Sequence, residues 1–211
     1  MKKTIIILLL LSCFLSFSSF KNEGVLNHPM PLLPNKTLDG QTIDADYYKG
    51  HVTIVSFMFI GCIPCMNEIS VLDKIQDEYA ANLHLQILCV ARQMREQMIQ
   101  FNDTGNSSCF SMVRRAMKVN PISYTIQPGC ATEPSKMVVK DMTEDGNSKD
   151  VSLKSECNTI EETFGISAFP CIFFVDKKGI VRKIKEGGPA IQNDAAFHDQ
   201  IKKEIDALLA E

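Results

Sequence analysis

The sequence predicts an α/β fold in which helices flank a central mixed β-sheet. Residues 52–60 form a nearly unbroken apolar run with β-branched residues, which is typical of a strand buried on both faces. The following apolar positions have the spacing of one helix face: Ile69, Leu72, Ile75 and Tyr79. This helix should reach about Ala81, and a second apolar run over residues 83–91 follows it. A strand, a helix and a strand in this order predict a parallel pair joined by a right-handed crossover.

The segment after the second strand is predicted to hold two short helices, a third strand and an insertion. These elements are expected over residues 95–101, 107–117, 122–126 and 127–157, respectively. The insertion is polar and contains Pro and Gly, in contrast to the apolar runs before it. Within it we expect a short hairpin around residues 136–142 and 151–153.

The C-terminal part of the chain is predicted to hold a helix, a strand hairpin and a last helix. Two apolar runs joined by Asp-Lys-Lys-Gly are typical of antiparallel strands with a tight turn. The expected elements are a helix over residues 158–164, strands over 171–175 and 180–184, and a helix through Phe197, Ile201, Ile205 and Leu208.

The first twenty residues have the pattern of a secretory signal peptide or an N-terminal anchor. Two lysines precede a short apolar segment, and Ser18 is small enough to precede a cleavage site. Lipid attachment at Cys13 is an alternative. Residues 25–211 are expected to form one domain in the periplasm or cell envelope, where disulfides persist. The net charge of -3 and the absence of a basic run predict no nucleic-acid partner, and contact with a membrane is expected only through residues 1–20.

Cys62 and Cys65 are separated by Ile63 and Pro64 and lie where the first strand gives way to the helix. Pro64 suits the first helical turn, where a missing N–H group removes no hydrogen bond. The unpaired N–H groups and partial positive charge of a helix N-terminus favour a thiolate. We therefore expect Cys62 to be the accessible nucleophile and Cys65 the buried thiol that resolves a mixed disulfide.

A zinc half-site and a purely structural bridge are the alternatives for this Cys-x-x-Cys motif. Zinc would require a second pair of ligands, and the sequence has no second Cys-x-x-Cys and no His-x3–5-His. The four histidines show no ligand spacing. A redox-active dithiol that needs neither metal nor cofactor is the interpretation we favour.

The remaining cysteines fall into two groups. Cys89 and Cys171 lie inside apolar runs and are expected to be reduced, buried and inert, although Cys171 could also lie near the dithiol. Three others fall in polar sequence: Cys109, Cys130 and Cys157. They predict one structural disulfide and one leftover thiol. A Cys130–Cys157 pair would join the two ends of the insertion, and a pair involving Cys109 is the rival.

Several motifs together resemble the exported thioredoxin-like thiol–disulfide oxidoreductases of the TlpA/ResA type. They are Leu38-Asp39-Gly40 and Tyr48-Lys49-Gly50 before the first strand, Glu68 after the two cysteines, Phe169-Pro170, and Val175-Asp176-Lys177-Lys178-Gly179. Asp39-Gly40 also has the sequence of a hairpin turn. The resemblance implies a thioredoxin-like sandwich with an N-terminal extension, and it places the insertion before the strand that follows Pro170.

The resemblance also implies how the site would work. Pro170 is expected to be cis and to face the dithiol, with Phe169, Ile63 and Pro64 contacting an extended substrate segment. The implied partners are protein thiols or disulfides and an upstream thiol protein that donates electrons. A trans proline that starts an edge strand is the alternative for Pro170.

This chain departs from the family pattern at three places. Gly61 replaces the aromatic residue before the first cysteine, Ser56 occupies the place of thioredoxin's buried acid, and the insertion exceeds the usual spacing. The second departure leaves the proton acceptor of Cys65 open. Glu68 is the candidate, and a solvated Glu on the helix face is the alternative.

Two other functions share elements of this pattern. A peroxiredoxin-like thiol peroxidase would need a hydroxyl residue three positions before Cys62 and a proline before that, but Phe59 and Val55 stand there. A non-enzymatic metal-delivery module using the two thiols would need a nearby downstream histidine, and residues 85–197 contain none.

Overall fold

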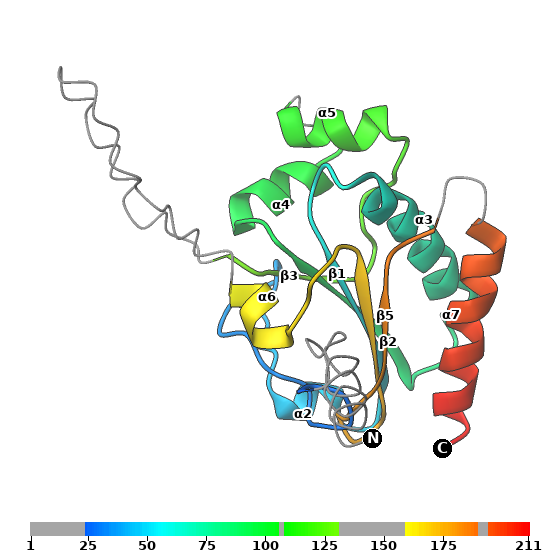
Figure 1. Cartoon of the computed structure of the whole chain (residues 1–211). Helices are drawn as coiled ribbons and strands as arrows, with labels where there is room; N and C mark the ends of the chain where they lie inside the picture. The colour runs from blue at the N-terminus through cyan, green and yellow to red at the C-terminus, as the bar shows by residue number, and fades with distance from the viewer. Residues whose placement is uncertain (1–23, 106–107, 131–158, 190–193) are drawn as a thin grey trace, which may run out of the picture.

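A computed structural model describes residues 24–105, 108–130, 159–189 and 194–211 (Figure 1). The predicted N-terminal signal or anchor and the predicted hairpin around residues 136–142 and 151–153 lie outside these ranges. Within the described part, no helix is long and apolar enough to cross a membrane.

The sheet is mixed and has five strands in the order β3-β2-β1-β4-β5. Their bounds are β1 Val52–Met58, β2 Leu85–Ala91, β3 Thr125–Pro128, β4 Cys171–Val175 and β5 Val181–Glu186. β1, β2 and β3 are parallel, whereas β4 pairs antiparallel with both β1 and β5. Every residue of the central strand β1 is buried, as its apolar sequence predicts.

Helices cover both faces of the sheet (Figure 1). Their bounds are α2 Ala45–Tyr48, α3 Ile63–Glu78, α4 Arg95–Asn102, α5 Cys109–Ala116, α6 Thr159–Phe164 and α7 Asp194–Leu209. α3 and α7 lie side by side and share one hydrophobic core with part of α4, and α2 and α6 contribute to a second core on the opposite face. The α/β sandwich with a mixed sheet is therefore confirmed.

The third strand begins three residues later, and ends two residues later, than the sequence predicts. Ile126 pairs with Cys89 and Pro128 with Ala91, so residues 127 and 128 belong to β3 and not to the insertion. The reason is that the Gln127 side chain is buried and donates a hydrogen bond to the carbonyl of Asn35, 2.7 Å away. A local sequence pattern cannot predict a contact between residues so far apart in the sequence.

The segment before β1 also differs from its prediction. Asp39-Gly40 forms a turn in which the Thr37 N–H donates to the carbonyl of Gln41, and Gly40 has a φ of 89° that suits glycine. No strands flank this turn, so the hairpin reading of the motif is wrong. Arg95 of α4 instead holds the segment by donating to the carbonyls of Thr37 and Leu38.

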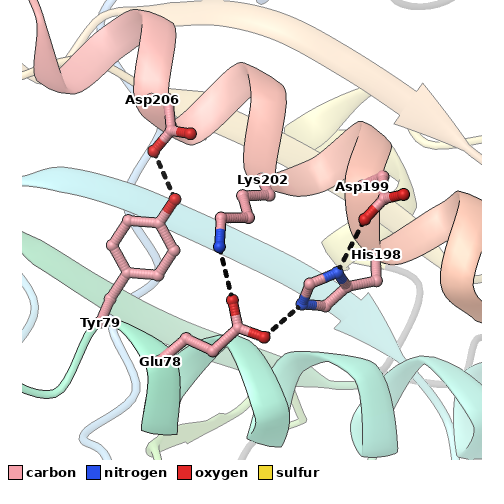
Figure 2. Close-up of polar contacts among 6 residues, drawn as sticks. All are labelled: Glu78, Tyr79, His198, Asp199, Lys202 and Asp206. Atoms are coloured by element: carbon pink, nitrogen blue, oxygen red, sulfur yellow. Dashed lines mark hydrogen bonds and ion pairs between the residues drawn. The ribbon is translucent and has the colours of Figure 1, made fainter.

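A polar network joins the C-terminal end of α3 to α7 (Figure 2). Glu78 accepts hydrogen bonds from Lys202, at 2.8 Å, and from His198, at 2.9 Å. The hydroxyl of the next residue, Tyr79, donates to Asp206. The hydrogen bond from Lys202 and the charge of His198 hold the pKa of the Glu78 carboxyl below its usual value. These contacts fasten α7 to the helix that carries the two active-site cysteine candidates.

We expect Lys202→Met to lower the melting temperature slightly at low salt, because the Glu78 carboxylate loses its closest cation. The deficit should vanish in 1 M salt, where charges are screened beyond about 3 Å, and also below the depressed pKa of Glu78, where the carboxyl is neutral. Thermal unfolding followed by circular dichroism measures both effects. Lys203→Met, at the exposed neighbouring position, is the matched control. A deficit that persists in high salt would instead indicate loss of the contact between the Lys202 ammonium and the Tyr79 ring, whose centroid lies 5.6 Å away.

Candidate functional site

Cys62 and Cys65 form a disulfide at the N-terminus of α3, with an S–S length of 2.06 Å. Cys62 is the N-cap residue of the helix, and its sulfur accepts a hydrogen bond from the Cys65 N–H at 3.2 Å. This N–H group is the kind of donor that would stabilise a thiolate on Cys62. Cys62 retains 7% of its accessible surface and Cys65 retains none, so the predicted order of exposure is confirmed.

Pro64 and Pro170 lie on either side of a loop that follows β5. The Phe169–Pro170 peptide bond is cis, as the resemblance implies, and the Pro170 carbonyl accepts a hydrogen bond from the Gly187 N–H at 2.8 Å. A Cβ atom at Gly188 would lie 2.7 Å from the Pro170 ring and 2.8 Å from the Pro64 carbonyl oxygen. Gly188 therefore lets the dithiol helix and the cis-proline loop approach each other closely.

Apolar side chains surround this junction. The rings of Phe59 and Phe169 meet edge to face, with centroids 5.5 Å apart. The contact is consistent with the strand register, because Phe57 pairs with Cys171 at the end of the ladder and Phe59 and Phe169 each lie two residues beyond that pair. Ile63 is 52% exposed, and Pro64 is also exposed. A partly apolar surface thus borders the disulfide where the sequence predicts substrate contacts.

Glu68 is buried, with 1% of its surface exposed, so the alternative of a solvated helix-face glutamate is wrong. It lies three residues after Cys65, on the same face of α3. Its Oε1 accepts a hydrogen bond of 2.6 Å from the Ser56 hydroxyl of β1, while no described residue donates to the buried Oε2. Burial raises the pKa of Glu68 to about 8, against the opposing effect of the Ser56 hydrogen bond. The site therefore contains a carboxyl group that changes charge near neutral pH.

The two cysteines of the inner strands behave as predicted. Cys89 and Cys171 are both free and buried, and burial raises the pKa of each thiol. Cys171 packs in the core on the α2 and α6 side of the sheet, whereas Cys65 belongs to the core on the α3 side. Cys171 is therefore a core residue on the face of the sheet opposite the dithiol.

The three cysteines near the insertion have separate outcomes. Cys130 is in a disulfide. Cys109, which begins α5 with its side chain exposed to solvent, is free, so its candidacy for the structural disulfide is wrong. Cys157 lies outside the described residues, and the Cys130–Cys157 pairing stays a prediction.

Within the described ranges, no three His, Cys, Asp or Glu side chains are grouped so that they could hold a metal ion. No protein-family model and no curated protein matches the sequence. Solved structures do match in three dimensions. A thiol-disulfide isomerase from Corynebacterium glutamicum superposes with a TM-score of 0.54 at 12% identity, over 88% of this chain and 97% of the other.

Two further solved structures give the same result. A protein assigned as the thiol:disulfide interchange protein DsbE from Chlorobium tepidum has a TM-score of 0.53 at 16% identity, over 86% of this chain and 95% of its own. The thioredoxin domain of a thiol-disulfide oxidoreductase from Bacteroides vulgatus has a TM-score of 0.52 at 15% identity, over 85% and 97%. The chain has the thioredoxin-like fold. At these identities the likeness concerns the fold, and the chemistry of this thioredoxin-like site has to be argued from its own residues.

Gly188 is a residue of the site that the sequence analysis did not identify. The available signal was the Gly187-Gly188-Pro189 sequence directly after the last strand, since paired glycines mark places where backbone segments turn or approach closely. Nothing in that signal names Pro64 and Pro170 as the neighbours, because both lie far away in sequence.

We expect Gly188→Ala to slow exchange at the dithiol and to lower the free energy of unfolding by about 1–3 kcal/mol, the usual cost of overpacking. The added methyl group would press on the backbone of Pro64 and on the ring of Pro170, which have little freedom to move. Rates of reduction by dithiothreitol and urea unfolding measure the two effects. Gly24→Ala, where a Cβ meets nothing within 4 Å, is the control. Wild-type rates and stability in Gly188→Ala would contradict this close approach.

Glu68→Gln should flatten the pH dependence of stability. The folded-state pKa of about 8 lies above the ordinary value of 4.5, so the folded protein binds a proton that the unfolded chain releases. Stability supplied by this proton is complete at low pH and is lost as pH rises through that window, with a slope approaching about 1.4 kcal/mol per pH unit. Urea unfolding of the oxidised protein between pH 4 and 9 measures the difference between wild type and variant. Parallel curves for the two proteins would contradict the raised pKa.

Proposed function

We propose that the chain is a thiol–disulfide oxidoreductase that exchanges its Cys62–Cys65 pair with protein substrates in the cell envelope. The observation that carries the proposal is the disulfide at the start of α3, next to the cis-Pro170 loop of a thioredoxin-like fold. A structural bridge would not require an exposed rim around it, yet Ile63, Pro64 and Gly61 are exposed there.

Exchange at this site takes place in two steps. A substrate thiolate attacks the Cys62 sulfur, the Cys62–Cys65 bond breaks, and Cys65 leaves as a thiolate that takes up a proton. A second substrate thiolate then attacks the substrate sulfur of the mixed disulfide, which releases an oxidised substrate and the Cys62 thiolate. In the reverse direction the dithiol is oxidised, a substrate disulfide is reduced, and Cys65 gives up its proton as it displaces the substrate from Cys62.

Glu68 is our candidate for the group that exchanges this proton with Cys65. The two residues share a face of α3, and both are buried away from bulk water. A carboxyl with a pKa near the working pH can both donate and accept the proton, which a solvated glutamate with an ordinary pKa cannot do efficiently. In the oxidised protein at neutral pH, Glu68 is mainly in its acid form and is ready to protonate the departing Cys65.

The substrate segment is proposed to lie against Phe169, Ile63 and Pro64, beside the cis-Pro170 loop. These side chains offer apolar surface next to Cys62, and the Phe59 ring packs edge to face against the Phe169 ring. An extended segment with a cysteine and an apolar neighbour would suit this surface, through the backbone-pairing mode of strand addition.

The location and the partners rest on the sequence. The basic and apolar pattern of residues 1–20 supports export to the periplasm or cell envelope, where a reactive disulfide needs an upstream thiol protein to be reduced again. The proposal includes no cofactor, because the electrons move between sulfur atoms.

We expect Cys62→Ser to abolish exchange while leaving the fold intact, and Cys65→Ala to accumulate mixed disulfides that the wild type resolves. The reason is that Cys62 is the residue of the pair that retains accessible surface, and Cys65 is the group that would displace a captured substrate. Insulin reduction measures the first effect, and non-reducing electrophoresis of the variant incubated with envelope proteins measures the second. Cys89→Ser, at a free and buried thiol, is the control. Retained activity in Cys62→Ser would overturn the proposed function.

A further inference from the structure

The hydrogen bond between Ser56 and Glu68 joins the central strand to the dithiol helix beneath the disulfide. Ser56 is 2% exposed and Glu68 is 1% exposed, and the Ser56 hydroxyl lies 2.6 Å from Oε1. The hydroxyl has a single proton, and it donates that proton to Glu68. Buried side-chain polar atoms normally have at least one hydrogen-bond partner, so Oε2 of the same carboxyl, to which no described residue donates, is an exception that calls for a reason.

The other polar groups around Glu68 cannot take over this role. Cys89 of β2, Cys171 of β4 and Tyr124 before β3 each lie close enough for the charge of Glu68 to raise their pKa values. The charge of Lys185 of β5 lowers the pKa of Glu68, and the Lys185 ammonium group donates its hydrogen bond to Gln200. Ser56 is the described residue that donates a hydrogen bond to the carboxyl.

We propose that Ser56 is a positioning residue for Glu68: its hydroxyl fixes Oε1 toward the sheet and leaves Oε2 as the oxygen that exchanges the proton with Cys65. This inference rests on the proposed function, in which Glu68 serves the dithiol. A carboxyl anchored through one oxygen cannot rotate freely about its last side-chain bond, so the other oxygen keeps one orientation. The hydroxyl also stabilises the carboxylate more than the acid, because a hydrogen bond to a charged acceptor is the stronger one.

Protons and electrons balance when the Cys62–Cys65 disulfide opens. When a thiolate attacks Cys62, the Cys62–Cys65 bond breaks and its electron pair goes to the Cys65 sulfur. The proton on Oε2 of Glu68 moves to that sulfur, which leaves a carboxylate held by the Ser56 hydroxyl. In the opposite direction the carboxylate accepts the Cys65 proton as the Cys65 sulfur forms its bond to Cys62.

The test is the pH dependence of disulfide opening by dithiothreitol, with each rate divided by the fraction of reductant present as thiolate. In the wild type this corrected rate should fall above about pH 8, where the acid form of Glu68 is lost. In Ser56→Ala the inflection should move upward by about one pH unit, since a buried carboxylate without its donor is harder to form. Ser56→Thr should keep the wild-type inflection, because it keeps the hydroxyl.

Two further variants make the result independent of folding defects. Ser56→Val has the shape of Ser56→Thr but no hydroxyl, so a shift in Val and not in Thr assigns the effect to the hydroxyl. In Ser56→Ala/Glu68→Gln the profile should match that of Glu68→Gln alone, because Ser56 acts only through the carboxyl. A structural role of Ser56 would lower stability without moving the inflection.

The outcomes separate the inference from the function on which it rests. If Glu68→Gln removes the inflection and Ser56→Ala and Ser56→Val leave it in place, the positioning role is overturned and the oxidoreductase stands. If the wild type shows no inflection that depends on Glu68, the proton-exchange role of Glu68 is overturned, and the positioning role of Ser56 is overturned with it. If Cys62→Ser still exchanges disulfides, the proposed function fails whatever the profiles show.

Discussion

The complete burial of β1 fixes where α3 begins, and the rest of the site depends on that position. Because both faces of this strand are covered, a one-residue slip in its register with β2 or β4 would move every side chain into the core on the opposite face, where it meets different packing partners. The chain therefore leaves the sheet at Met58, turns through Gly61 and starts the helix at Ile63. The same register brings the residue before cis-Pro170 opposite the residues before Cys62, so one constraint assembles two distant segments.

Alternation along the strands then sorts the polar groups between the two cores. Ser56 and its register partner Cys89 belong to the side of the sheet that α3 covers, and Cys171 belongs to the other side. A thiol on the far face cannot compete with Cys65 for Cys62, whatever its redox state. The strand period thus isolates the reactive pair from a cysteine that lies only one residue beyond Pro170 in the sequence.

Local patterns predict what depends on neighbours in sequence. The run over residues 52–60 and the helical spacing after Cys65 were enough for the central strand and the dithiol helix, whereas the cis state of Pro170 was predicted only from the family resemblance. They could not predict the burial of Glu68, because a charged residue on an amphipathic helix is normally solvated and its partner Ser56 lies on another element. The role of Gly188 and the start of β3 were not predicted for the same reason. Each depends on contacts between residues that are far apart in the sequence.

The unpaired oxygen of Glu68 is difficult to explain as a structural feature. A buried polar atom without a partner costs about 1–3 kcal/mol, and an apolar residue at this position of α3 would avoid that cost. Two anions in one dry site would also repel each other, so a Cys65 thiolate and a Glu68 carboxylate disfavour one another and share a single proton between them. In the oxidised protein that proton resides on Glu68, because a disulfide sulfur cannot hold it. Opening the disulfide creates a competing base, the Cys65 thiolate, one helical turn away. Burial raises the pKa of Glu68 and keeps the proton on its carboxyl until that base appears.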